Sequence, residues 1–362
     1  MILMSKRILA AACAAATALA LSACSPSAST GDKTSKASKD GTLTVMASFY
    51  PLKYLAEKVG GEHVTVTSLT PDGAEPHDLE LSPKMVDSLA SADAVVYLAG
   101  FQGAVDEAIE QHAPTTVIDV SSAAQLVAID STSNHPGEDE GTDEAQSGEA
   151  QSGEAQSGKA QSGEAADHDH EGHEHEGHDH EHADHDHHHD MSMDPHFWLD
   201  PARMANAATL VGDKLAEADP TNAETYKANA QALNKELTSL GDNLVTKTST
   251  CQIKTFVTAH TAFGYLADRT GLTQVGISGL DPESSPSPAR LAEIGKIAKD
   301  QGVTTIFTEA LIDPKVAQTL ADDLGISTAV LDPIESQTDS SKDYAAVMND
   351  NIDALTKANN CQ

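Results

Sequence analysis

The amino-acid sequence predicts an α/β fold with two lobes, each built on a four-stranded parallel sheet and joined by one long, rigid helix. Short apolar runs alternate with helical segments in residues 42–131, and the same alternation returns in residues 249–362. Continuous apolar strands that alternate with helices are typical of parallel sheets covered on both faces. A helical segment longer than one lobe needs lies between the two stretches. A chain of 362 residues has room for two lobes.

The N-terminal lobe is expected to span residues 42–131. Its predicted strands are residues 42–47, 64–69, 94–99 and 115–120, and its predicted helices are residues 52–59, 82–90 and 102–111. Residues 191–221 return to this lobe after an insert and contain one further helix. Asp200 suits the N-cap of that helix, and Pro201 suits its first turn, where the missing N–H is not needed. Asp219-Pro220 is expected to end it.

Residues 222–248 are predicted to form the helix that joins the lobes. Apolar side chains recur in it at helical spacing. They are Tyr226, Ala230, Leu233, Leu237, Leu240 and Leu244. At about 1.5 Å per residue such a helix reaches nearly 40 Å, which favours a rigid connection, although an ordinary surface helix is the alternative.

The C-terminal lobe is expected to span residues 249–362 and to repeat the pattern of the first. Its predicted strands are residues 255–259, 273–277, 303–307 and 328–331, and its predicted helices are residues 261–270, 288–300, 314–324 and 341–357.

Residues 1–23 have the features of a secretory signal. Lys6-Arg7 precedes an apolar run of 14 residues, which is shorter than the roughly 20 residues that a transmembrane helix needs. The run ends in Leu21-Ser22-Ala23-Cys24, which resembles the lipobox of bacterial lipoproteins. Cys24 is therefore the expected site of lipidation, and residues 24–41 are expected to be a flexible tether.

Cys251 and Cys361 are the two cysteines that remain when Cys13 leaves with the signal and Cys24 carries lipid. An even pair in an oxidising compartment favours a disulfide over two free thiols. Closing a loop of roughly 100 residues stabilises the fold by about 4–5 kcal/mol in the chain-entropy model. No C-x-x-C pair is present, so a cysteine zinc site has no support.

Residues 132–190 are predicted to be a disordered, acidic, His-rich insert. A five-residue unit, AQSGE, begins at Ala145 and recurs without a hydrophobic face, so it cannot bury enough surface to order itself. Within the insert, the stretch from His168 to His189 holds 11 of the 17 histidines. Its composition favours weak metal binding without a specified geometry. The formal charge of −34 excludes nucleic-acid binding, because such a chain repels phosphate backbones.

Three histidines outside the insert lie at points where strands give way to loops. His77 follows the second predicted strand, His196 lies in Asp194-Pro195-His196-Phe197-Trp198, and His260 follows the strand of residues 255–259. Ligands of open α/β sheets bind at the carboxyl ends of strands. Three imidazoles with one carboxylate suit tetrahedral Zn²⁺.

The residues leave several candidates for the fourth ligand. Asp332 occupies a strand end in the C-terminal lobe and is the preferred candidate. Glu75, Glu283 and Glu309 are alternatives by loop position, although a structural ion pair or cap is the preferred interpretation of Glu309. The remaining histidines, His63 and His112, are interpreted as ordinary surface or core residues.

Six short motifs resemble the zinc-specific substrate-binding proteins of bacterial ABC importers, the metal receptors with a rigid helical backbone. They lie in the family's order between about residue 42 and residue 362. They are Ala47-Ser48-Phe49-Tyr50-Pro51-Leu52, Pro71-x-Gly73-x-x-Pro76-His77, Asp194-Pro195-His196-x-Trp198-Leu199-Asp200-Pro201, Thr258-x-His260-x-Ala262-Phe263-x-Tyr265, Ser285-Pro286-Ser287-Pro288 and Leu331-Asp332-Pro333.

The resemblance implies a Zn²⁺ receptor with a site in the cleft between the lobes, formed by His77, His196 and His260 with Asp332 as the fourth or a weaker ligand. It also implies an ABC permease with a cytoplasmic ATPase as partner, and a monomer held by lipid on Cys24 at the outer face of the cytoplasmic membrane. A glutamate replaces the third histidine in manganese-binding relatives, and this chain has His260. The alternatives are a manganese or other divalent-metal receptor, or a surface zinc buffer or adhesin without a permease.

An enzyme is not expected. No H-E-x-x-H motif, Gly-x-Ser-x-Gly turn or Walker loop occurs in the chain.

Overall fold

The computed structural model describes residues 41–112, 114–129 and 193–362. All of these residues belong to one compact unit, Lys36–Gln362. None of the helices in the described ranges is both long and apolar enough to cross a membrane. The predicted signal peptide, Cys24, the whole predicted insert and all of the predicted tether except residue 41 lie outside the described residues. The domain limits given above remain a prediction.

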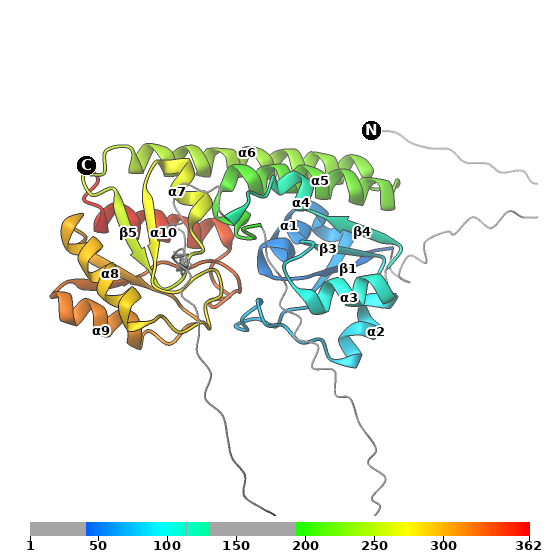
Figure 1. Cartoon of the computed structure of the whole chain (residues 1–362). Helices are drawn as coiled ribbons and strands as arrows, with labels where there is room; N and C mark the ends of the chain where they lie inside the picture. The colour runs from blue at the N-terminus through cyan, green and yellow to red at the C-terminus, as the bar shows by residue number, and fades with distance from the viewer. Residues whose placement is uncertain (1–40, 113, 130–192) are drawn as a thin grey trace, which may run out of the picture. The chain divides into compact units, whose positions relative to one another are not determined.

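The first sheet contains four parallel strands in the order β2-β1-β3-β4 (Figure 1). Its strands are β1 (Leu43–Ala47), β2 (Val64–Ser68), β3 (Ala94–Tyr97) and β4 (Thr116–Asp119). The helices that follow them are α1 (Tyr50–Gly60), α2 (Pro83–Ser91), α3 (Gly103–His112) and α4 (Ser121–Ala124), with a short 3₁₀ turn, η1, at Gly61–His63. The strand order reverses between β1 and β3, and this is the point where ligands bind in such sheets.

The second sheet repeats this arrangement in the order β6-β5-β7-β8. Its strands are β5 (Thr255–Thr258), β6 (Thr273–Gly276), β7 (Thr305–Thr308) and β8 (Ser327–Val330). The helices are α7 (Gly264–Thr270), α8 (Pro288–Asp300), α9 (Lys315–Leu324) and α10 (Tyr344–Ala358). All strand pairs in both sheets are parallel. The predicted fold class is therefore confirmed.

Two long helices, α5 (Pro201–Ala218) and α6 (Ala223–Thr248), pack side by side (Figure 1). The 3₁₀ turn η3 (Phe197–Leu199) precedes α5. Gly212 allows close packing, because a Cβ there would lie 2.4 Å from the Cβ of Ala230. With 26 residues, α6 is about 39 Å long. It packs against α1 and α5 on the N-terminal side and against α7 and α10 on the C-terminal side.

One hydrophobic core runs through both halves of the described chain. It joins side chains of β1 and α1 to those of α5, α6, α7 and α10. Two smaller cores lie on the other faces of the sheets, beneath α2 and α3 in the first and beneath α8 and α9 in the second. The apolar face of α6 thus belongs to the core that both sheets share, which gives the helix its role as a rigid connection.

Side-chain caps set several helix starts. Asp200 accepts a hydrogen bond from the N–H of Ala202 and Pro201 begins α5, as the sequence predicts. Asp343 caps α10 by accepting from the N–H of Ala346, so this helix begins later than the predicted residue 341. At the other end of α10, Cys251 and Cys361 are joined by a disulfide.

Candidate metal centre

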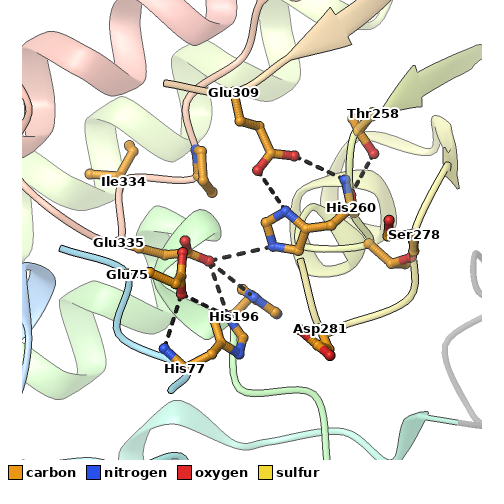
Figure 2. A network of polar contacts seen from close by, with 12 residues as sticks. Glu75, His77, His196, Thr258, His260, Ser278, Asp281, Glu309, Ile334 and Glu335 are labelled. Carbon is orange, nitrogen blue, oxygen red and sulfur yellow. Dashed lines mark hydrogen bonds and ion pairs between the residues drawn. The ribbon is translucent and has the colours of Figure 1, made fainter. Parts of the chain in front are cut away.

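Four side chains from distant parts of the chain converge on one point (Figure 2). His77 lies in the loop after β2, and His196 immediately precedes η3. His260 follows β5, and Glu335 lies in the loop after β8. Each parallel sheet presents the carboxyl ends of its strands at one edge, so the loops that carry His77, His260 and Glu335 leave the sheets at these edges. The segment before η3 adds His196 to the same point.

The Glu335 carboxylate lies at the centre of the three imidazoles (Figure 2). Its Oε1 is 3.4 Å from Nε2 of His77, 3.3 Å from Nε2 of His196 and 3.4 Å from Nε2 of His260. The four candidate ligand atoms all lie within 4.8 Å of one another.

These distances fit a tetrahedral metal ion. Bonds of about 2.0–2.1 Å to zinc place two ligand atoms of a tetrahedron about 3.3–3.4 Å apart, which matches the separations from Glu335. The Nε2 atoms of His196 and His260 are buried and make no hydrogen bond to any described residue. Buried polar atoms without partners are rare and costly. A bound cation would satisfy both nitrogens.

Burial and neighbouring charged groups shift the pKa of each of the four clustered side chains. Burial by itself lowers the pKa of His260, but the carboxylates of Glu309 and Glu335 raise it well above its ordinary value. The pKa of His196 is raised in the same way by Asp194 and Glu335. Burial keeps the pKa of His77 below its ordinary value. The three neighbouring imidazoles outweigh burial at Glu335 and hold its pKa well below the usual range.

Two further carboxylates orient the imidazoles. Nδ1 of His196 lies 2.8 Å from Oδ1 of Asp194, and Nδ1 of His260 lies 2.6 Å from Oε2 of Glu309. Glu309 also accepts a hydrogen bond from the backbone N–H of His260 at 3.0 Å. A protonated Nδ1 that donates to a carboxylate leaves the Nε2 lone pair free for a metal. Glu309 follows β7 and His260 follows β5. These two strands pair in the second sheet, so the two residues are neighbours.

The His77 loop is held by contacts of its own. Gln102 donates from Nε2 to the carbonyl oxygen of Pro76 and to Oγ1 of Thr70, both at 3.0 Å. Glu75 accepts from the N–H of His77 at 3.0 Å. Burial and the charge of Glu335 raise the pKa of Glu75 to about 7.

The loop that carries Glu335 follows the second sheet but is attached to the N-terminal part of the chain. The indole N–H of Trp198 donates to the carbonyl oxygen of Pro333 at 2.7 Å. The N–H of Gly73 donates to Oγ of Ser336 at 2.6 Å, and Tyr344 donates from its hydroxyl to the carbonyl oxygen of Trp198 at 2.5 Å. These contacts place Glu335 with His77 and His196, whereas His260 is held by the second sheet.

Glu335, and not Asp332, supplies the carboxylate of the cluster. Asp332 accepts from the N–H of Ile334, and its own backbone N–H donates to Asn351 of α10. Ile334 has a positive φ of 58°, which turns the chain so that the next side chain enters the cluster. Asp332 is the first carboxylate after β8, which is why the sequence favours it. A search for any acid within the whole loop would have included Glu335.

The other predicted alternatives have different places. Glu283 is exposed in a loop after β6 and lies outside the cluster. Glu309 contacts His260 on the side away from the other imidazoles (Figure 2), so it orients a histidine and does not join the four-atom cluster.

The sequence of this chain matches one protein family over residues 45–358. The profile of that family is described as "ZnuA: Zinc-uptake complex component A periplasmic". The chain belongs to this family.

Two curated relatives of this ZnuA family member differ in how much of their length they share with it. The high-affinity zinc uptake system protein ZnuA of Bacillus subtilis is 31% identical over 348 residues, which cover 94% of each chain. The zinc-binding lipoprotein AdcA of Streptococcus pneumoniae is 32% identical over 323 residues, which cover 87% of this chain and 56% of AdcA. The chain thus spans little more than half the length of the AdcA proteins that it matches.

Solved structures of the family have the same fold. The Zn(II)-bound ZnuA-like domain of Streptococcus pneumoniae AdcA superimposes with a TM-score of 0.64 at 28% sequence identity, covering 88% of this chain and 99% of that domain.

Proposed function

We propose that this chain is an extracytoplasmic receptor that binds Zn²⁺ tightly and delivers it to the permease of an ABC importer. The observation that carries the proposal is the cluster of His77, His196, His260 and Glu335, in which the distances from the carboxylate to the three imidazoles match the edges of a zinc tetrahedron. The names of the relatives, a zinc uptake system protein and a zinc-binding lipoprotein, support it.

The four side chains are the proposed zinc ligands, with Asp194 and Glu309 as the groups that orient two of them. Four protein ligands leave no open position for an activated water. The site is therefore suited to hold its ion as cargo and not to catalyse a reaction. Zinc is preferred over manganese because imidazole suits Zn²⁺, whereas carboxylate-rich sites suit Mn²⁺.

The lipid anchor on Cys24 belongs to this proposal and lies outside the described residues. It would keep a monomeric receptor at the outer face of the cytoplasmic membrane, next to its permease. The name of the streptococcal lipoprotein supports this location.

Zinc uptake by cells tests the proposal against the zinc-buffer alternative. A strain that lacks this chain should take up radioactive zinc slowly in zinc-poor medium. The unaltered chain should restore uptake, whereas the Glu335→Ala variant should not. Normal uptake by the deleted strain would contradict an import role and favour buffering.

Deleting residues 139–190 should leave the tight zinc site intact. All four proposed ligands lie outside the deletion. The described residues before and after it also contact each other directly. Ala128 pairs with Met193, and the N–H of Asp194 donates to the carbonyl oxygen of Val127 at 3.0 Å. Calorimetry should show a single tight zinc in the deleted form and additional, weaker binding in the full chain. Loss of tight binding on deletion would place part of the primary site in the insert.

Zinc affinity should fall as the pH is lowered, and the fall should begin above pH 6.5. Each imidazole binds zinc only when its Nε2 is deprotonated. The pKa of His196 and that of His260 are raised in the metal-free protein, so protons compete above the ordinary histidine pKa of about 6.5. Competition titrations from about pH 8 to about pH 5.5 would measure this. An affinity that is constant across that range would contradict ligation by these histidines.

A further inference from the structure

Glu75 lies beside the metal cluster without being one of its four members. Its Oε1 accepts a hydrogen bond from the backbone N–H of His77 and lies 4.0 Å from Nε2 of the same residue. Its Oε2 is buried and has no hydrogen-bond partner among the residues that the structure describes. A buried carboxylate oxygen without a partner is costly, by about 1–3 kcal/mol or more. The His77 loop provides a hydrogen-bond donor for Oε1 but none for Oε2.

Exposure to solvent falls stepwise from Glu75 into the cluster. The side chain of Glu75 is 20% exposed and that of His77 is 6% exposed. Glu335 is 1% exposed, and the side chains of His196 and His260 are fully buried. Among these five side chains, only Glu75 and His77 have an exposed fraction above 1%. A metal ion that reaches the cluster by the most solvated side therefore meets Glu75 first.

We propose that Glu75 is the first ligand of an arriving Zn²⁺ and transfers the ion to His77 and Glu335. This inference rests on the zinc-binding function proposed above. Zinc bonds to carboxylate oxygen and imidazole nitrogen are each about 2.0–2.2 Å. The separation of 4.0 Å between Oε1 of Glu75 and Nε2 of His77 allows one ion to contact both. The next step is shorter, because Nε2 of His77 lies 3.4 Å from Oε1 of Glu335 (Figure 2).

A ligand that acts only during transfer has a characteristic kinetic effect. It lowers the barrier between free and bound zinc without changing either end state, so its removal slows association and dissociation by the same factor. A residue that only shapes the loop behaves differently, because loss of the loop structure weakens the bound state and speeds dissociation. Glu75→Gln separates the two roles, since glutamine keeps an oxygen that can accept from the His77 N–H but has no charge.

The single tryptophan of the chain provides a local signal for zinc arrival. The ring centroid of Trp198 lies 5.2 Å from that of His196, so its fluorescence responds to the cluster and not to metal bound elsewhere on the full chain. Stopped-flow mixing with Zn²⁺ gives the association rate constant, and mixing the zinc form with excess chelator gives the dissociation rate constant. Glu80→Gln is the matched control, because Glu80 is exposed in the same loop and its loss changes the net charge equally.

We expect Glu75→Gln to lower both rate constants by roughly tenfold or more, with Kd within about threefold of the unaltered protein. Glu80→Gln should change neither rate constant by as much as twofold. An association rate equal to that of Glu80→Gln, or a weaker Kd caused by faster dissociation, would overturn the role of Glu75. If either result is found and the unaltered protein binds zinc tightly, only the role of Glu75 is overturned and the proposed receptor function is not affected. Absence of tight zinc binding by the unaltered protein would overturn both proposals.

Discussion

Replacing Glu335 with alanine should weaken zinc binding by more than the roughly 10–100-fold loss typical of changes outside the ligand set. The substitution removes the carboxylate that lies 3.3–3.4 Å from all three imidazole Nε2 atoms. It leaves three neutral ligands around a divalent ion. Competition with a chelator of known affinity, together with circular dichroism to check folding, would measure the loss.

Asp332→Asn is the matched control in the same loop. Asparagine keeps an oxygen that can accept from the N–H of Ile334, as Asp332 does now, and the residue is not one of the four members of the cluster. Its zinc affinity should stay within about threefold of the unaltered protein, as expected of a change outside the ligand set and its supporting contacts. The opposite result, in which Asp332→Asn binds zinc weakly and Glu335→Ala binds it tightly, would favour Asp332, the ligand that the sequence alone suggests.

Replacing Trp198 with alanine should lower the free energy of unfolding by about 3–5 kcal/mol, the usual range for a buried tryptophan. The side chain is fully buried. Its ring centroid lies 4.8 Å from that of Phe49 and 5.7 Å from that of Phe101. These two aromatic residues follow β1 and β3, where the strand order of the first sheet reverses. Thermal or denaturant unfolding followed by circular dichroism would measure the change.

The same substitution should also weaken zinc binding by roughly tenfold or more, the range for groups that support ligands. Trp198 is two residues from His196 and holds the Glu335 loop through Pro333, so it aligns two of the proposed ligands. Trp198→Phe is the milder variant, because it keeps the ring packing and removes only the N–H donor to Pro333. Unchanged zinc affinity in a folded Trp198→Ala protein would show that the loop is positioned by other contacts.

Much of the fold could be predicted because its signals are local. Apolar runs alternating with helical segments specify parallel sheets, and the spacing of Leu233, Leu237 and Leu244 specifies one face of a long helix that the structure buries. At α10 the observed start differs from the predicted one, and the cap by Asp343 explains that difference. The three histidines were also accessible from the sequence, since each lies in a loop next to an element whose position the topology dictates.

The choice among carboxylates was decided only by the tertiary structure. Asp332 and Glu335 are three residues apart in one polar loop, and no periodicity distinguishes them. The turn at Ile334 and the contacts of that loop with Trp198 and Gly73 bring Glu335 to the imidazoles. Glu309 was likewise ambiguous until the pairing of β5 with β7 placed it against His260. The sequence by itself therefore determined the two sheets, the connecting helix and the imidazoles, whose signals are local. The position of the fourth proposed ligand depends on long-range packing between residues more than 130 positions apart, such as the hydrogen bond from Trp198 to Pro333, and such packing has no local signature.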